Sequence, residues 1–330
     1  MKRRDFLIGS AYAMTSTISQ AKISSATLPW STTTPLPIRT QELYPAIHQG
    51  RLYVAGGIAS RLGATYFTDR FFSFDPSKNL WHEETNLPES LHHAALVSCQ
   101  NRLFLVGGFN GGYTHVWRMR DRVYEYVEGI WHERAALPAP QAEGVLTCHN
   151  GLIHLVSGQS PRDEKNKLRH HHKEVNHHLV WEPGSSQWES AAPIPLASNS
   201  ATGTWVGNQL VYTGGRNSNG NFDATYIYDK QEDRWRKASP LPLPQAGTAS
   251  VAVEDGIIVF GGEIFVPNSK VFKNVWRYVL SKDQWLPLAD MPTPRHGIGA
   301  GRIGDKIYVV GGATEPGGNG TSNLNEVFSL

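Results

Sequence analysis

The feature that most constrains the fold of this chain is a Trp-to-Gly interval that recurs six times at one length. In the last copy, Trp285 and Gly311 are 26 residues apart. The same 26-residue interval follows five earlier tryptophans, although Ser157 replaces the glycine in the third copy. The six tryptophans are Trp30, Trp81, Trp131, Trp188, Trp235 and Trp285. Copies that recur at about 50 residues indicate a repeat architecture in which each copy is one structural unit.

Each copy carries the pattern of four short β-strands. It ends in an apolar run before a glycine pair, as in YVVGG at residues 308–312. Five copies also place an aromatic residue seven positions before the next tryptophan, with alternating apolar neighbours, as at Tyr228. A glycine pair suits a strand end with positive φ, or a place where a large ring packs on bare backbone. The sequence therefore predicts an all-β protein.

These spacings resemble the Kelch repeat, the blade unit of one class of β-propeller. The resemblance covers Trp30 to Leu330 and implies a six-bladed propeller with four antiparallel strands in each blade. The C-terminal copy ends without a following tryptophan, and Trp30 has no glycine pair before it. We therefore expect the strand around Trp30 to join the C-terminal blade and to close the ring. Because propellers serve enzymes, scaffolds and ligand binders alike, this resemblance does not fix the function.

The N-terminus has the shape of an export signal. Residues 1–21 begin with a basic head, continue with a short apolar stretch and end in small residues before Ala21. The segment RRDFL at residues 3–7 resembles the twin-arginine export motif, which implies a bacterial periplasmic or extracellular location. An ordinary basic N-terminus is the alternative. We expect cleavage after Ala21 and a single propeller over residues 22–330, in the periplasm.

The composition excludes several classes of partner. The formal net charge is +2, and basic and acidic residues are interspersed along the chain. We therefore expect no nucleic-acid partner, since no basic tract is present. We also expect no membrane partner, because no apolar run approaches the ~20 residues of a membrane helix. We expect a monomer without a cofactor.

The two cysteines fall near the ends of innermost strands in neighbouring copies. Cys99 lies 18 residues after its tryptophan and Cys148 lies 17 residues after its own. Such positions point to opposite faces of a strand, so two buried free thiols are predicted rather than the disulfide that an exported protein would allow. A copper site like that of galactose oxidase is not expected, because its ligands would include a Tyr-His pair and the chain has no Tyr-His dipeptide.

The third copy has the longest insertion between its glycine and the next strand. This insertion contains five histidines, which are His170, His171, His172, His177 and His178. Histidine clusters can bind zinc or copper, but this spacing matches no metal signature. A solvated basic loop is the favoured interpretation, and no metal site is predicted.

The candidate site consists of polar residues at two positions of the repeat, which a propeller would gather around one mouth of its channel. One position is the start of the innermost strand and the other lies just past the glycines. Arginine forks at a concave mouth suit a carboxylate or phosphate, although Arg and Glu could also pair only with each other. The candidate proton carriers are Glu143, Glu164 and His296. The candidate ligand-binding residues are Arg39, Glu42, Arg61, His93, Gln141, Arg162, Arg216, Asn217, Gln245, Glu263 and Arg295.

Two classes of function are compatible with this face. The chain resembles the periplasmic sialic acid mutarotases, exported Kelch propellers that interconvert sugar anomers by acid–base chemistry. That resemblance implies an acidic carbohydrate ligand, held by Arg216 or Arg295. The alternative is a non-catalytic propeller that binds a protein or a glycan in the periplasm.

Trp235 and Trp205 are expected to differ in how much their truncation destabilises the fold. Trp235 lies at a repeat position and is predicted to be largely buried between its outer strand and the neighbouring blade. Trp205 lies outside the repeat's aromatic positions. Its truncation is therefore expected to be milder.

Overall fold

The computed structural model describes residues 29–112 and 115–330. The predicted signal segment 1–21 lies outside this range. The described part is all-β apart from two short 3-10 turns, η1 (Arg169–His171) and η2 (Leu280–Lys282). It contains no helix long and apolar enough to cross a membrane.

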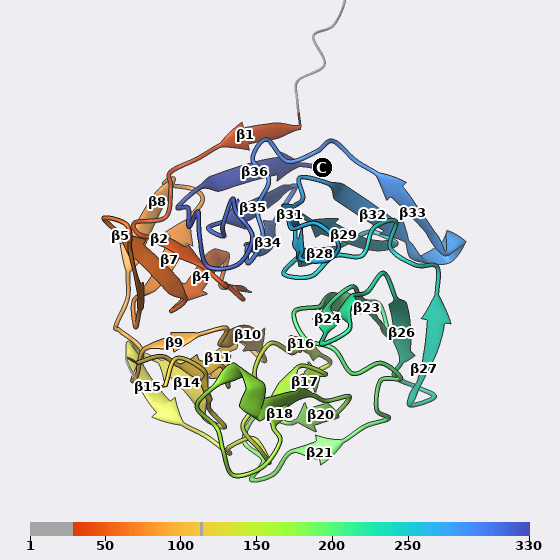
Figure 1. Ribbon diagram of the computed structural model, residues 1–330, viewed down its shortest axis with the longest axis horizontal. Helices are drawn as coiled ribbons and strands as arrows, with labels where there is room; N and C mark the ends of the chain where they lie inside the picture. Colours follow the sequence, from red (N-terminus) through yellow and green to blue (C-terminus); the bar gives the residue numbers. More distant parts are fainter. Residues whose placement is uncertain (1–28, 113–114) are drawn as a thin grey trace, which may run out of the picture.

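Within that range, the structure contains six four-stranded antiparallel sheets, and Figure 1 shows them arranged radially around one centre. We number the sheets 1 to 6 along the chain. Sheet 1 contains β3 (Ala46–His48), β4 (Arg51–Ala55), β7 (Phe71–Asp75) and β8 (Leu80–Glu83). Sheet 2 contains β10 (Ala95–Cys99), β11 (Arg102–Val106), β14 (Val123–Val127) and β15 (Ile130–Glu133). Sheet 3 contains β16 (Val145–His149), β17 (Leu152–Val156), β20 (His178–Trp181) and β21 (Glu189–Ser190).

The remaining sheets have the same order from the centre outwards. Sheet 4 contains β22 (Thr202–Val206), β23 (Gln209–Thr213), β26 (Thr225–Asp229) and β27 (Arg234–Ala238). Sheet 5 contains β28 (Ala249–Val253), β29 (Gly256–Phe260), β32 (Val275–Val279) and β33 (Gln284–Pro287). Sheet 6 contains β34 (Gly299–Ile303), β35 (Lys306–Val310), β36 (Asn325–Ser329) and β1 (Trp30–Thr32). The Trp30 strand thus pairs with the C-terminal strand, as the sequence predicts, with Trp30 opposite Phe328.

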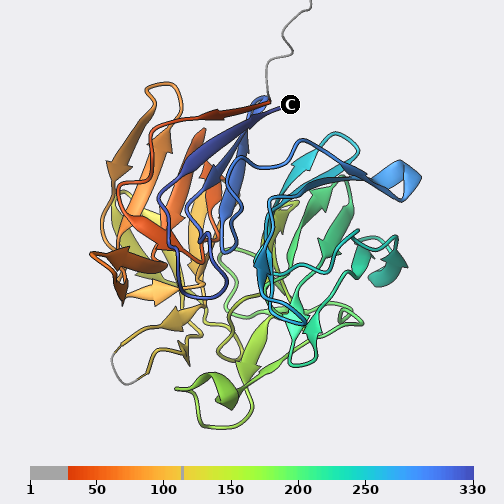
Figure 2. The ribbon, with the colours of Figure 1, turned by 45° about the horizontal axis from the view of Figure 1, so that its top comes forward.

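Short strands extend the sheets on one face, which we call the loop face. In Figure 2 the β5–β6 hairpin and the insertion of the third copy project from the same side of the ring. These short strands are β2 (Arg39–Gln41), β5 (Ile58–Arg61), β6 (Ala64–Phe67), β9 (Leu91–His92), β12 (Phe109–Asn110), β13 (Arg118–Met119), β18 (Gln159–Pro161), β19 (His172–Glu174), β24 (Arg216–Asn217), β25 (Gly220–Asn221), β30 (Glu263–Ile264) and β31 (Lys270–Val271).

The repeat tryptophans link each sheet to its neighbour. Each indole N–H donates to the carbonyl of the residue that lies four positions after the preceding tryptophan, as from Trp235 to Ala192 at 2.8 Å. The bond from Trp30 to Ala289, at 3.1 Å, joins the first copy to the last in the same way. The other four bonds run from Trp81 to Thr34, Trp131 to Thr85, Trp188 to Ala135 and Trp285 to Ser239. A single tryptophan per copy therefore accounts for one bond at every sheet boundary.

The glycine pair serves a second set of bonds between sheets. The second glycine donates its N–H to a carbonyl of the next copy, as from Gly312 to Thr40 at 2.9 Å. The first glycine adopts positive φ, and in the last copy a Cβ on Gly311 would lie 2.6 Å from the Thr40 carbonyl. The close neighbour is therefore a backbone carbonyl rather than a large ring. Ser157 adopts φ 60° at the same position and donates its hydroxyl to the Ser198 carbonyl.

The prediction of free thiols is wrong, because Cys99 and Cys148 form a disulfide with their Cα atoms 5.5 Å apart. The two residues do lie on opposite faces of their strands. However, β10 and β16 belong to adjacent sheets, whose facing surfaces are opposite faces of the repeat. Because the two cysteines point to opposite faces of their strands, both side chains point into the space between sheets 2 and 3, where the sulfurs meet.

The expectation that Trp235 is largely buried is also wrong. Trp205 is buried in the core between sheets 3 and 4, whereas Trp235 is only partly buried against that core. The Trp205 ring stacks on His149 with centroids 4.1 Å apart and meets His154 edge-on. An aromatic outside the repeat pattern thus fills a place that the repeat alone leaves open.

Candidate functional site

Six titratable side chains meet at the loop-face end of the central channel, and each comes from a different copy of the repeat. Three lie 12 residues after their tryptophan, one lies 11 residues after it, and two lie just past a glycine pair. We call this set the charge ring. In order around the channel its members are Glu42, His93, Glu143, Arg216, Glu263 and His296. All six are among the residues that the sequence predicts for the site.

The backbone beneath the charge ring has an unusual conformation in every copy. The residue 12 positions after each tryptophan has φ between 53° and 65°. This is the left-handed backbone region, which residues other than glycine rarely adopt. Ser200 N–H donates to the Glu143 carbonyl, and Gly247 N–H donates to Ser200. Gly297 N–H donates to Gly247, and Glu42 N–H donates to Gly297. Four of the six copy boundaries are tied in this way, and the left-handed conformation directs the side chains of Glu42, His93 and Glu143 to one place.

His93 bridges two carboxylates of the charge ring. Its Nε2 atom lies 3.2 Å from Glu42 Oε2 and 3.2 Å from Glu143 Oε1. Its Nδ1 atom lies 2.7 Å from Nδ1 of His92, whose Nε2 must donate to the Val116 carbonyl. Burial lowers the pKa of His92 to about 3, so that ring is neutral and its Nδ1 accepts. His93 then donates from Nδ1 to His92, and its Nε2 atom faces the two carboxylates.

The other half of the charge ring is held in a similar way. Arg216 Nη1 donates to Glu263 Oε1 at 2.6 Å. His296 Nε2 donates to the Glu315 carbonyl at 2.9 Å. Its Nδ1 atom lies 3.5 Å from Glu263 Oε2 and 3.9 Å from Glu42 Oε1. Acidic and basic residues therefore alternate around the whole circle.

The pKa values reflect this mutual pairing. Burial alone would raise the pKa of Glu42, but the charges of His93, His296 and Arg216 outweigh burial and lower it. The pKa of Tyr44 is raised well above its usual value by burial and by nearby carboxylates. Glu42 is therefore an anion at neutral pH, and Tyr44 is a neutral hydroxyl.

Arg216 carries the permanent positive charge of the ring. Burial lowers the pKa of its guanidinium, but Glu143 and Glu263 outweigh burial, so the net shift is upward. The guanidinium also lies 5.1 Å from the ring centroid of Phe265, at cation–π distance. The environment of Arg216 therefore keeps this side chain charged.

Three polar atoms of the charge ring have no hydrogen-bond partner in the described structure. They are Glu143 Oε2, His296 Nδ1 and Arg216 Nε. Glu143 and His296 are almost completely buried. Unpaired buried atoms of this kind cost free energy unless a water molecule or a ligand satisfies them. The ring thus offers one acceptor and two nitrogen sites to a small hydrogen-bonding group.

Three predicted ligand-binding residues are instead placed inside the sheets. Gln141 and Gln245 donate their side-chain amides to the carbonyl at the first position of their own glycine pair, at 2.5 and 2.6 Å. Arg295 occupies the equivalent position and donates to Gly311 at 2.6 Å and to Glu326 at 2.7 Å. Its guanidinium is completely buried.

The remaining candidates do not reach the charge ring. Arg39, Arg61, Arg162 and Glu164 are exposed on the loop face. Asn217 is partly buried and uses its side chain to accept a hydrogen bond from Asn219 within the β24–β25 turn. These residues surround the ring at a distance rather than taking part in it.

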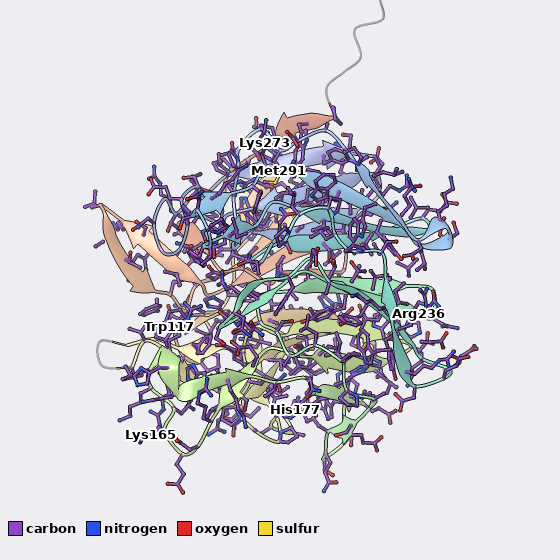
Figure 3. The ribbon with its side chains drawn as sticks, turned by 45° about the vertical axis from the view of Figure 1, so that its right-hand side comes forward. Trp117, Lys165, His177, Arg236, Lys273 and Met291 are labelled. Carbon is purple, nitrogen blue, oxygen red and sulfur yellow. A yellow bond between two sulfur atoms is a disulfide. The ribbon has the colours of Figure 1, made fainter. Side chains whose placement is uncertain are left out.

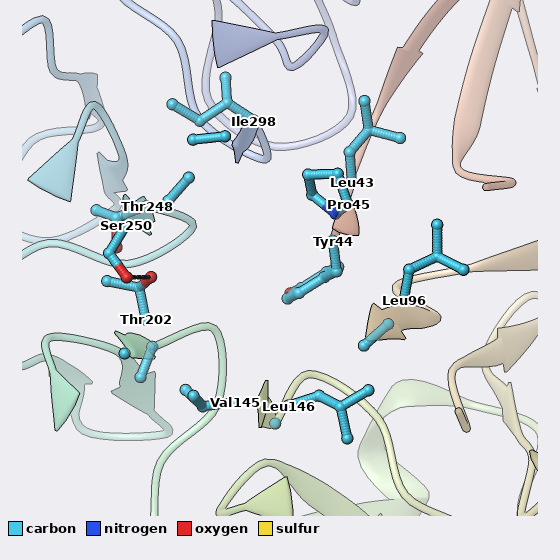
Figure 4. A pocket seen from close by; sticks show the side chains of 16 residues that line it. Leu43, Tyr44, Pro45, Leu96, Val145, Leu146, Thr202, Thr248, Ser250 and Ile298 are labelled. Carbon is cyan, nitrogen blue, oxygen red and sulfur yellow. Dashed lines mark hydrogen bonds between the residues drawn. The ribbon is translucent and has the colours of Figure 1, made fainter. Parts of the chain in front are cut away.

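Sequence reasoning missed Tyr44, and it placed His92 at the mouth without making it a candidate site residue. Tyr44 lies two positions beyond Glu42, and its ring extends into the channel in Figure 4. His92 precedes His93 and stacks on Phe67 and Phe109. The His92-His93 dipeptide was the available signal, because one histidine can fix the proton position of the next.

The five histidines of the third insertion have different environments. His172 and His178 are buried, whereas His170 and His177 are exposed. His178 Nε2 lies 2.9 Å from His154 Nδ1 in the core. The favoured interpretation of a solvated loop is therefore wrong for two of the five. Within residues 29–112 and 115–330, no group of three or more His, Cys, Asp or Glu side chains is arranged to hold a metal ion.

The channel below the charge ring is narrow. Its cavity has a volume of about 100 Å³ and is lined mostly by small and apolar residues of the innermost strands. Thr202 and Ser250 share a hydrogen bond across its wall, as Figure 4 shows. This volume accommodates a few water molecules rather than a sugar.

Comparisons with known proteins agree with the repeat pattern. Residues 138–312 match the KLHDC2/KLHL20/DRC7 Kelch-repeats domain, and residues 45–88 match the Kelch motif. The chain is 24% identical to Kelch-like protein terF of Aspergillus terreus, over 78% of this chain and 56% of that protein. It is 34% identical to mouse Kelch-like protein 35, over 52% of this chain and 26% of that protein. It is 22% identical to beta-scruin of Limulus polyphemus, over 68% of this chain and 25% of that protein.

The chain thus spans about half or less of the length of these relatives. The match to the Kelch-repeats domain alone, residues 138–312, covers more than half of the 330 residues. With the repeated Trp-to-Gly interval and the radial antiparallel sheets, this match shows that the chain belongs to the Kelch-repeat family.

Proposed function

We propose that the six sheets are the blades of one closed propeller, and that the chain is a non-catalytic module that binds a partner protein on its loop face. The observation that carries this proposal is the set of exposed apolar side chains at the tips of loop-face hairpins. Leu62, in the β5–β6 turn, is 99% exposed, and Val266, in the β30–β31 loop, is 69% exposed. Phe265 and Leu168 are also exposed. Apolar tips on several hairpins of one face favour a protein interface.

The charge ring supports a binding module over a catalyst. Its side chains are largely buried and use most of their charged atoms on one another. The adjoining cavity, at about 100 Å³, is too small for a sugar. In this proposal the ring holds the six copies in register, and the loops above it contact the partner.

A selection from a library of short displayed peptides tests this proposal. We expect peptides selected on the mature chain to lose affinity by about tenfold when Leu62→Asp or Val266→Asp is introduced, because a charge replaces a buried apolar contact. Ile130→Asp is the matched control, since Ile130 is an exposed apolar residue of the outer strand β15. Equal losses in all three variants, or no selected peptide at all, would contradict the proposal.

A second candidate function is the mutarotase activity, which the three unpaired atoms of the charge ring favour. Glu143 Oε2 is an acceptor without a donor, and it belongs to a carboxylate whose other oxygen lies 3.2 Å from His93 Nε2. Such a pair could accept and return the proton of an anomeric hydroxyl if the loops opened. Arg216 would hold the carboxylate of an acidic sugar in place of Glu263.

Anomer exchange of N-acetylneuraminate, followed by NMR, tests the second candidate. The expected result is faster exchange with the wild type and a loss of about a hundredfold in Glu143→Gln, whose affinity for the sugar is retained. An exchange rate that is the same with and without the wild-type protein would eliminate this candidate. The binding module would then remain.

We further propose that the chain acts outside the cytoplasm, in the periplasm. The twin-arginine-like segment at residues 3–7 supports an exported protein. The disulfide between Cys99 and Cys148 supports an oxidising compartment.

A further inference from the structure

A groove on the loop face runs along the boundary between sheet 1 and sheet 6. Its larger part has a volume of about 640 Å³ and lies beside β2, β5 and β6. A second hollow of about 320 Å³ lies beside Thr314 and residues 320–324. The two parts share Arg39 and Asn323 in their walls. We call these two adjoining hollows together the seam groove.

The charge on the seam groove is of one sign. Arg39, Arg61 and Arg70 line it, and neither an Asp nor a Glu is among the described residues of its walls. Arg39 lies opposite Ser60 in the β2–β5 ladder, directly beside Arg61. Arg70 pairs with Glu83. Within the described residues, Arg39 and Arg61 have no acidic partner, whereas most other arginines of the chain are paired.

The same groove has an apolar wall. Leu62 is 99% exposed at the β5–β6 turn, and Tyr66 is also exposed in the same hairpin. Guanidinium groups recognise carboxylates through paired hydrogen bonds. Covering the exposed leucine and tyrosine side chains with an apolar group is favourable, because it removes apolar surface from water. A polyanion without apolar groups would use only half of this surface.

We propose that the seam groove binds an extended segment of a partner protein, in which Asp or Glu residues flank an apolar side chain. The carboxylates contact Arg39 and Arg61, and the apolar side chain packs on Leu62 and Tyr66. The seam groove continues past Arg39 from the β5–β6 hairpin to Thr314 and residues 320–324, which suits an extended chain better than a compact ligand. This inference rests on the proposed function, since it names the part of the loop face and the chemistry of the partner.

Peptides selected on the mature chain test the site directly. The expected result is that the main class of selected peptides is rich in Asp and Glu and that Arg39→Glu and Arg61→Glu each weaken its binding by about tenfold. A synthetic fluorescein-labelled copy of the best peptide gives these affinities by fluorescence anisotropy. The same peptide with Gln and Asn in place of its acidic residues should lose its preference for wild type over Arg61→Glu. Arg61→Lys should recover only part of the affinity, because lysine keeps the charge but not the fork.

Arg236→Glu is the matched control. Arg236 is an exposed arginine on the outer strand β27, and Figures 1 and 3 place that strand on the other side of the ring from β5. We expect this variant to bind the selected peptides like the wild type. A loss in Arg236→Glu that equals the loss in Arg39→Glu would overturn the proposal, because a general charge effect would then explain both. Thermal melting of each variant confirms that its fold is retained.

The outcomes separate the failure of this site from the failure of the proposed function. Selected peptides that depend on Val266 but not on Arg39 or Arg61 would overturn the seam groove and leave a binding loop face. If no peptide is selected at all, both fail. Dextran sulfate that binds through Arg39 and Arg61, when no selected peptide does, would assign the groove to a polyanion and overturn the peptide proposal.

Discussion

Acidification from about pH 6.5 to pH 4.5 is expected to unfold this protein. Four histidines are buried and uncharged in the native state, and burial is the main cause of their lowered pKa values. The pKa is about 3 for His92 and His154, and about 4 for His172 and His178. In the unfolded chain these side chains bind protons near their ordinary pKa of 6.5.

The sign of the effect follows from which state binds protons. A lowered native pKa means that the stabilisation is complete above pH 6.5 and is lost as the pH falls, because the unfolded state takes up protons first. Each histidine reduces the free energy of unfolding by up to ~1.4 kcal/mol per pH unit in this window. Four of them together remove roughly 10 kcal/mol by pH 4.5, which is comparable to the whole stability of a typical domain.

Urea unfolding at a series of pH values measures this loss. His154→Gln should flatten the pH dependence, because the amide can still bond to His178 but does not titrate. The control is His132→Gln, at an exposed position of β15, which should leave the profile unchanged. Carboxylates such as Glu42, whose pKa is lowered from 4.5, lose their contribution only below this window. A free energy of unfolding that stays constant between pH 6.5 and 4.5 would contradict the prediction.

Arg295→Gln is expected to lower the free energy of unfolding by about 3–5 kcal/mol, because it leaves a buried carboxylate without its cation. Glu326 is 2% exposed and accepts from Arg295 at 2.7 Å and from Thr293 at 2.8 Å. Glutamine can still donate to the Gly311 carbonyl, as Gln141 does to the equivalent carbonyl in sheet 3. The loss therefore reports the uncompensated charge rather than a missing bond.

The double variant Arg295→Gln/Glu326→Gln provides the control within the same site. We expect it to recover most of the lost stability, since a neutral amide replaces the buried charge. Chemical denaturation of the wild type, both single variants and the double variant gives the coupling free energy. If the double variant were less stable than Arg295→Gln alone, the buried charge would not be the cause.

Much of the fold could be predicted from the sequence because one spacing recurs in every copy. The 26-residue interval between Trp30 and Gly56 recurs in each copy, so the positions of the strands could be predicted from it. The pairing of the Trp30 segment with the C-terminal strand could be predicted from the same pattern. Contacts between sheets were harder to predict. The opposite faces of Cys99 and Cys148 were read on one strand, whereas the disulfide depends on how two sheets face each other.

The charge ring was predictable by residue, but its neighbours were not. Positions 10 and 12 after a tryptophan are only two residues apart, yet they differ completely in environment. Arg295, at the first position, is enclosed in its sheet, whereas Glu143, at the second, reaches the channel through its left-handed backbone. Arg295 and Glu143 are both charged residues in the sequence, and nothing in the residue pattern indicates that their side chains point in different directions.

The alternation of the charge ring limits how the repeat number of such a chain can change. An alternating circle closes only when its number of members is even. Duplication of any one copy would insert a second acid beside an acid, or a second base beside a base, and deletion of one copy would bring two like charges together. The intermediate with an odd number of repeats would carry that repulsion in a buried place. A chain of this type therefore gains or loses its repeats more readily in pairs.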